Sequence, residues 1–144
     1  MYLVDTDVLS AGSPTRRKSR ATLVTWMDEN SDRLFISTIT VAEIDAGIAK
    51  ARRDDARRKA ADLTDWLEAL LHIYGTRVLP FDIDAARLAG RLSDLARSKG
   101  HAPGFADVAI AAIAAAHRLT VLTGNIRHFA HFGVPIRNPF EELP

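Results

Sequence analysis

The chain opens with a short apolar run that leads directly into two acids: Met1-Tyr2-Leu3-Val4-Asp5-Thr6-Asp7-Val8-Leu9-Ser10. An apolar run of this length, bounded by polar residues, is typical of a buried strand in a mainly parallel sheet. Ligands of such sheets bind just beyond the carboxyl ends of the strands. Asp5 and Asp7 therefore lie where an α/β protein usually has its ligand-binding or catalytic residues.

The rest of the sequence alternates between strand and helix patterns. Further strands are expected at 34–37, 77–80, 120–123 and around 134–136, and helices at 18–30, about 40–52, 54–74, 82 or 84 to before Gly100, and 105–117. The segment 54–74 has the strongest helical period, an apolar stripe that Gly75 ends. Because strands alternate with helices, we expect one α/β domain over residues 1–144, with four to five mainly parallel strands flanked by helices.

Composition narrows the class of protein. The chain has 144 residues, of which 47% are hydrophobic and 26% charged, as in an ordinary globular domain. It has no cysteine, which excludes disulfides and thiolate metal sites. An acid interrupts the first apolar run at position 5, and Ala106 to Ala116 is too short to span a bilayer. We therefore expect a cytoplasmic protein with no membrane segment.

The charges are unevenly placed, although the net charge is only +1. Two basic runs stand out: Arg16, Arg17, Lys18 and Arg20, and then Lys50, Arg52, Arg53, Arg57, Arg58 and Lys59. Either run suits a solvated helix face. If both flank a cleft, they would hold the phosphate backbone of a nucleic acid, and we expect such contacts at Arg16, Arg17 and Lys18.

Four polar residues fall at element boundaries on the same side of the expected sheet: Asp5, Glu43, Asp107 and Asn125. Each also suits a structural role. Asp5 can cap the next helix, and Thr40 and Glu43 have the spacing of a capping box. Asp107 can interact with a helix dipole, and Asn125 can occupy a turn.

A gathering of these acids would need a cation. Two carboxylates about 4 Å apart repel by about 4 kcal/mol at an effective dielectric constant of about 20. Oxygen ligands without cysteine or paired histidines favour Mg²⁺ or Mn²⁺ over zinc. One or two such ions can activate water and stabilise the oxygens that attack and leave in phosphodiester hydrolysis.

Four stretches carry a resemblance to a known family: Tyr2 to Ser10, Ser37 to Glu43 with Gly47, Asp107 to Ala112, and Leu122 to Asn125 with Phe129. In this order, over residues 2–129, the chain resembles the PIN-domain ribonucleases, and specifically the VapC/FitB-like toxins of VapBC toxin–antitoxin modules. The resemblance implies a PIN-like fold and a Mg²⁺- or Mn²⁺-dependent endoribonuclease.

The same resemblance implies site residues and partners. It places metal-binding carboxylates at Asp5, Glu43 and Asp107, and it implies a homodimer and a cognate antitoxin that blocks the site. The substrates it implies are structured RNAs, often transfer or ribosomal RNA.

The sequence departs from the family pattern at two positions. Asp7 stands where many members have asparagine, and we expect it to support the site together with Thr6 and Thr123. Asn125 occupies the position expected for a fourth acid, and His128 stands where related sequences place an acid. An asparagine can bind a metal through its carbonyl oxygen or orient a water, but it adds no charge. We therefore count Asn125 as catalytic, and expect one tightly held ion and a second that depends on bound RNA.

Three alternatives compete with this interpretation. A haloacid-dehalogenase-like phosphatase would use Asp5 as nucleophile and Asp7 as acid/base, but it needs an acidic pair where Gly124 and Asn125 stand. A non-cleaving PIN-like domain that binds RNA or a partner would explain the missing fourth acid. A Ser- or His-dependent hydrolase finds no support, because the five histidines show no ligand or triad spacing and most are expected at the surface or at helix ends: His72, His101, His117, His128 and His131.

Overall fold

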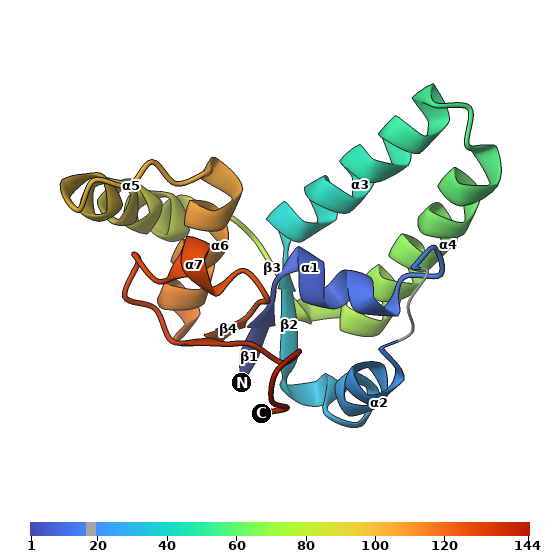
Figure 1. Ribbon diagram of the computed structural model, residues 1–144, viewed down its shortest axis with the longest axis horizontal. Coiled ribbons are helices and arrows are strands. Elements are labelled where there is room, and N and C mark those ends of the chain that lie inside the picture. The colour runs from blue at the N-terminus through green and yellow to red at the C-terminus, as the bar shows by residue number, and fades with distance from the viewer. Residues whose placement is uncertain (17–19) are drawn as a thin grey trace.

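A parallel sheet with the first strand at its centre organises the molecule (Figure 1). The computed structural model describes residues 1–16 and 20–144. The strands are β1 (Tyr2–Val4), β2 (Leu34–Ser37), β3 (Val78–Leu79), β4 (Thr120–Leu122) and β5 (Ile136–Arg137). Their order is β3-β2-β1-β4-β5, and every neighbouring pair is parallel, with Leu3 opposite both Phe35 and Val121. The predicted α/β fold, with four to five mainly parallel strands, is confirmed, and the sheet has five strands.

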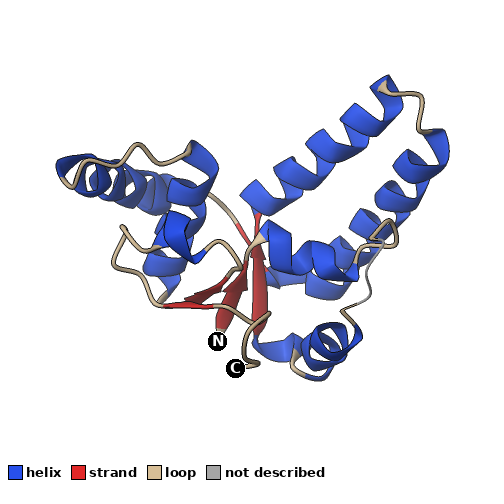
Figure 2. Cartoon of the chain, in the orientation of Figure 1, coloured by secondary structure: helices blue, strands red, loops and turns tan. Residues whose placement is uncertain are grey.

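Helices cover both faces of this sheet (Figure 2). They are α1 (Thr6–Leu9), α2 (Ala21–Glu29), α3 (Thr38–Arg53), α4 (Arg57–Tyr74), α5 (Ile83–Ser98), α6 (Phe105–His117) and α7 (Ile126–Phe129), with short 3-10 turns at Ser10–Gly12, Ser31–Arg33 and Gly75–Arg77. Leu3 and Val121 belong to the apolar core under α5 and α6, whereas Val4 and Leu122 belong to the core under α2, α3 and α4. This alternation follows from the two-residue period of a strand.

The start of α3 differs from the sequence expectation. Ser37 caps this helix, because its Oγ accepts a 3.0 Å hydrogen bond from the backbone N–H of Thr40. The helix therefore begins at Thr38, and Thr40 lies fully buried inside its first turn. The capping box expected between Thr40 and Glu43 is wrong, since Ser37 at the end of β2 takes the capping position. Glu43 is thereby free for another role.

The helical hairpin of α3 and α4 projects from the sheet (Figure 1), and residues of both helices line a cleft. The two helices are separated by a tight turn in which Asp55 has a φ of 56°, so α4 starts at Arg57 rather than at 54. Gly75 ends α4 with a φ of 52°, as predicted. Of the apolar stripe on α4, Leu67 and Tyr74 are buried in the core. No helix within the described ranges has the length and apolar character that a bilayer crossing requires.

Candidate active site

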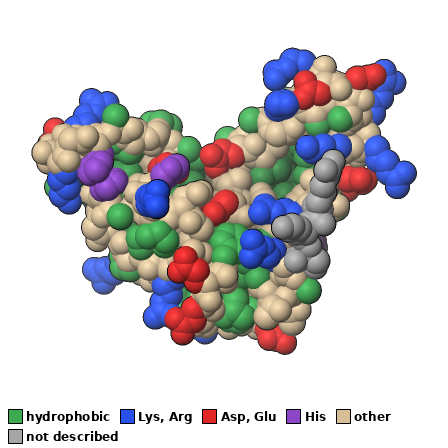
Figure 3. Space-filling model, viewed as in Figure 1, with side chains coloured by type: hydrophobic (Ala, Val, Ile, Leu, Met, Phe, Trp, Pro, Cys, Tyr) green, Lys and Arg blue, Asp and Glu red, His purple; other side chains and the backbone are tan. Residues whose placement is uncertain are grey.

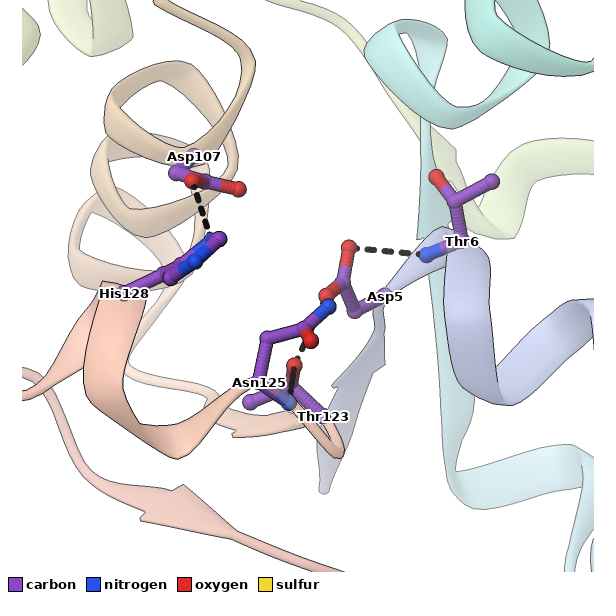
Figure 4. Close-up of polar contacts among 6 residues, drawn as sticks. All are labelled: Asp5, Thr6, Asp107, Thr123, Asn125 and His128. Atoms are coloured by element: carbon purple, nitrogen blue, oxygen red, sulfur yellow. Dashed lines mark hydrogen bonds and ion pairs between the residues drawn. The ribbon is translucent and has the colours of Figure 1, made fainter. Parts of the chain in front are cut away.

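Asp5 is the buried centre of the site. It follows β1 directly, and only 5% of its surface is exposed. Its Oδ1 accepts a 2.8 Å hydrogen bond from the backbone N–H of Thr6, which caps α1, and its Oδ2 accepts a 2.8 Å hydrogen bond from Thr123 Oγ1 (Figure 4). Asp5 therefore has both the position at a strand end and the capping role that the sequence suggested.

The surroundings of Asp5 disfavour its charge. Burial raises the pKa of the Asp5 carboxyl from 3.8 to about 7, and the negative charges of Asp7 and Asp107 act in the same direction. The hydrogen bonds from Thr123 and Thr6 lower this pKa, but they offset only part of the effect. A cation beside Asp5 would reverse the balance, because opposite charge favours the ionised carboxylate.

Asp7 supports the site through a backbone contact at Gly124. Its Oδ2 accepts a 2.9 Å hydrogen bond from the backbone N–H of Gly124, which ties α1 to the loop after β4. The packing leaves no room for a side chain at position 124: a Cβ there would lie 2.8 Å from Asp7 Oδ2 and 2.9 Å from the Phe140 ring. Burial raises the pKa of Asp7 too, and its buried Oδ1 has no hydrogen-bond partner among the described residues.

Glu43 reaches the site through a chain of hydroxyl groups. Its side chain is exposed on α3, and its Oε2 accepts a short hydrogen bond from Thr6 Oγ1. Thr6 Oγ1 also lies 3.3 Å from Thr40 Oγ1, which in turn lies 3.1 Å from Ser37 Oγ. The sequence pattern named Thr6 as a supporting residue, but it did not reveal the contributions of Thr40 and Ser37.

Asp107 enters from the opposite wall of the cleft. It lies in the first turn of α6, and its Oδ2 is 3.1 Å from Nδ1 of His128, which comes from α7 (Figure 4). The Asp107 side chain is 26% exposed and the His128 side chain 61% exposed. The resemblance placed His128 where related sequences have an acid, but its contact with Asp107 was not predicted, because no sequence spacing links the two residues.

Asn125 stands at the rim of the site. It precedes α7 as the N-cap, and its backbone N–H donates a 3.0 Å hydrogen bond to Thr123 Oγ1, the same hydroxyl that donates to Asp5. Its exposed side chain does not cap the helix, and in Figure 4 it is directed toward Asp5. The amide group is therefore available to a ligand.

The acids do not form a ready-made metal cluster. Within residues 1–16 and 20–144, no group of three His, Cys, Asp or Glu side chains lies close enough together to hold one ion. Each acid instead has its own partner: Asp5 has Thr123, Glu43 has Thr6, and Asp107 has His128. The donors nevertheless fit a hard divalent ion, because they are carboxylate oxygens and one of them is buried without an ion pair among the described residues.

A basic groove continues from the site along the α3–α4 hairpin. Thr6 and Glu43 stand at one end of it, and its cavity volume is about 360 Å³. Arg16, Lys50 and Lys59 line it, so both basic runs of the sequence contribute to one groove. Figure 3 shows acidic side chains in the notch between α5–α6 and the hairpin, with Lys and Arg side chains on the hairpin side. Arg17 and Lys18, the other predicted RNA contacts, lie outside the described residues.

Comparison with known proteins identifies the family to which the chain belongs. Residues 2–134 match the family model described as "PIN domain", so the chain belongs to the PIN-domain family. The phosphatase alternative is excluded by this assignment.

Similar proteins cover the whole chain. The plasmid stability protein StbB of Pseudomonas syringae pv. tomato is 37% identical and the VapC ribonuclease Y4jK of Sinorhizobium fredii is 35% identical; in both cases the match covers 98% of this chain and 99% of the relative. Among solved structures, FitAcB from Neisseria gonorrhoeae has a TM-score of 0.84 at 33% identity, covering 97% of this chain and 99% of that one. A member of the VapBC family of toxin–antitoxin systems, VapBC-5 from Mycobacterium tuberculosis, has a TM-score of 0.63 at 25% identity, covering 94% of both chains.

Proposed function

We propose that this chain is a divalent-metal-dependent endoribonuclease that acts as the toxin of a toxin–antitoxin module. The observation that carries the proposal is the buried Asp5 carboxyl, whose pKa burial raises to about 7 and on which Asp7 and Asp107 act with further negative charge. A divalent ion would supply the positive charge that this site lacks. The likeness to a VapC ribonuclease over nearly the whole chain supports the reaction class.

In this proposal Asp5, Glu43 and Asp107 hold one or two Mg²⁺ or Mn²⁺ ions. When bound, such an ion acts as a Lewis acid toward the phosphate and activates water for attack. Asp5 is held in place by Thr123 and Thr6, so its buried carboxylate has a fixed direction.

Asn125 and Asp7 complete the proposed machinery. The Asn125 amide, at the rim, orients the attacking water or the scissile phosphate without adding charge. Asp7 holds the backbone of Gly124 and so fixes the loop that presents Asn125. Without a fourth carboxylate, the second ion would depend on phosphate oxygens of the RNA for part of its coordination.

The basic groove gives the RNA a path to the acids. Arg16, Lys50 and Lys59 line it, and they would neutralise successive phosphates while the chain of nucleotides enters the notch at Glu43. Lys50 is paired with Asp54 at 2.5 Å in an exposed ion pair, which is weak enough to exchange for a phosphate.

An antitoxin would use the same groove. Its lining combines apolar side chains, among them Ile44, Leu63 and Trp66, with the basic residues named above. A protein segment with apolar and acidic side chains would cover the apolar lining, pair with the basic side chains and close the entrance at Thr6. Leu67, on the same helix as Leu63, is 4% exposed and belongs to the core.

A homodimer is the third part of the proposal. The side chains of Ile83 and Phe105, at the starts of α5 and α6, are 78% and 67% exposed. Phe105 packs edge-on against Phe81 with ring centroids 5.7 Å apart, which extends the apolar surface. Sedimentation of the wild type and of the Phe105→Ser variant would test whether this surface joins two copies.

One observation favours a second candidate, a PIN domain that binds RNA without cutting it. The described residues hold no preformed group of three metal ligands, and Asn125 stands where an acid was expected. The two candidates differ in one assay. Purified chain is incubated with total RNA after EDTA treatment and after adding back Mg²⁺ or Mn²⁺. Fragments that appear only with the ion support the nuclease, whereas intact RNA under every condition, together with a measured RNA affinity, supports the binder.

A further inference from the structure

His128 contacts a proposed metal ligand from a fixed position. It lies on α7, whose next residue, Phe129, is fully buried between α6 and the sheet. This anchor sets where the His128 side chain leaves the backbone. Its Nδ1 is 3.1 Å from Asp107 Oδ2 (Figure 4), and the His128 side chain is 61% exposed.

The distance between these two atoms suits a shared ion. Two neighbouring ligands of an octahedral ion, at bond lengths of about 2.1 Å, are about 3 Å apart. Nδ1 without a proton and a carboxylate oxygen would repel each other at 3.1 Å. A positive group must therefore lie between His128 Nδ1 and Asp107 Oδ2. In the metal-free protein this is the proton of the Nδ1–H tautomer, and a cation can take its place.

We propose that His128 binds the divalent ion beside Asp107, and that this nitrogen donor makes the site select Mn²⁺ over Mg²⁺. The inference rests on the ion site of the proposed function and adds a ligand to it. Mg²⁺ prefers oxygen ligands and retains its waters, whereas first-row transition ions bind imidazole nitrogen more strongly. An all-carboxylate site would not make this distinction.

Two other histidines serve as an internal comparison. His101 and His131 line the same hollow as His128 and Asp107, and their rings stack with centroids 3.4 Å apart. Within the described part of the chain, neither forms an ion pair with a carboxylate. His131→Ala is therefore a matched control, since it removes an imidazole from the same hollow without touching Asp107.

The test measures ion binding without RNA. Metal-free wild type, His128→Ala, His128→Asp and His131→Ala are titrated with Mn²⁺ and with Mg²⁺ by calorimetry. We expect His128→Ala to weaken Mn²⁺ binding by at least about tenfold, with a much smaller effect on Mg²⁺. His128→Asp should shift the preference toward Mg²⁺, because it replaces the nitrogen with an oxygen ligand. Electron spin-echo spectra of the Mn²⁺-loaded wild type should show coupling to an imidazole nitrogen that His128→Ala loses and His131→Ala keeps.

Three results would overturn the inference. They are an unchanged Mn²⁺/Mg²⁺ affinity ratio in His128→Ala, a nitrogen coupling that survives in that variant, and tighter binding of both ions. The last would show that His128 competes with the ion for Asp107. Failure of the proposed function would give a different result. RNA would stay intact with either ion, although the calorimetric titrations and the nitrogen coupling would behave as expected for a His128 ligand.

Discussion

Thr123 Oγ1 donates a 2.8 Å hydrogen bond to Asp5 Oδ2, joining residues that are 118 positions apart in the chain. Because β1 and β4 are neighbours in the sheet, the side chains that follow them meet at the same edge. The same Thr123 hydroxyl accepts from the backbone N–H of Asn125, so one side chain positions both the buried acid and the loop that carries the amide.

Thr123→Val should show how much this hydrogen bond contributes to the pKa of Asp5 and to stability. The variant keeps the shape of the side chain but leaves Asp5 Oδ2 without its donor, so the pKa of Asp5 should rise above about 7, because that hydrogen bond lowers it. The free energy of unfolding should fall by roughly 1–3 kcal/mol. Carboxyl ¹³C shifts of Asp5 across pH, together with urea unfolding, measure both. Thr120→Val, at the start of β4, is the control. An unchanged Asp5 pKa would show that Thr123 does not tune this acid.

The raised pKa of Asp5 predicts an unusual pH dependence of stability. Between pH 3.8 and about pH 7, Asp5 keeps its proton in the folded chain but has lost it in the unfolded chain. The free energy of unfolding of the metal-free protein should therefore fall as pH rises through this range, and Asp5→Asn should remove part of the fall. Asp7, whose pKa is raised too, acts in the same direction.

Urea unfolding at about pH 5 and about pH 8 checks this prediction. Saturating Mn²⁺ should restore stability at the higher pH, since an ion that binds only the folded chain stabilises it. If the wild type and Asp5→Asn lose stability in parallel between the two pH values, Asp5 does not titrate as predicted.

Gly124→Ala should disrupt the loop after β4. A Cβ at this position would lie 2.8 Å from Asp7 Oδ2 and 2.9 Å from the Phe140 ring, so the loop or its neighbours must move. We expect a decrease of about 1–3 kcal/mol in the free energy of unfolding. Gly90→Ala, in α5 with open space around its Cβ, should instead be neutral or stabilising by up to about 1 kcal/mol. Equal stability of Gly124→Ala and wild type would contradict the close packing.

The basic groove predicts a change in salt dependence. Replacing Lys59 with alanine should weaken RNA binding. The slope of log affinity against log salt concentration should become shallower by about 0.7 for each phosphate that the variant no longer neutralises. Arg16→Ala should act similarly, because both side chains line the groove. Arg58 is the neighbour of Lys59 on α4 but does not line the groove, so Arg58→Ala should leave the slope nearly unchanged. Identical slopes for the Lys59 and Arg58 variants would remove the groove from the RNA path.

Much of the architecture could be predicted because it depends on local patterns. The apolar run at 2–4 marks the central strand, and parallel strands necessarily bring their following residues to one edge. The positions of Asp5, Asp7 and Asn125 follow from that rule alone.

The remaining parts of the site depend on packing that the sequence does not display. Ser37 and Thr40 are both hydroxyl residues of the same segment, and only the observed end of β2 identifies Ser37 as the cap. The contact of His128 with Asp107 depends on how α7 is rotated against α6. The exclusion of a side chain at Gly124 depends on Phe140, which returns to the site from the end of the chain.

The central claim, a metal-dependent ribonuclease built on Asp5, Glu43 and Asp107, is tested most directly by the Asp107→Asn variant. RNA cleavage with Mn²⁺ or Mg²⁺ is compared for the wild type, Asp107→Asn and Asp94→Asn, an exposed acid on α5, with the thermal transition of each recorded alongside. We predict that Asp107→Asn cleaves at least about a hundredfold more slowly with its thermal transition retained, while Asp94→Asn cleaves like the wild type. Undiminished cleavage by a folded Asp107→Asn variant would contradict the account.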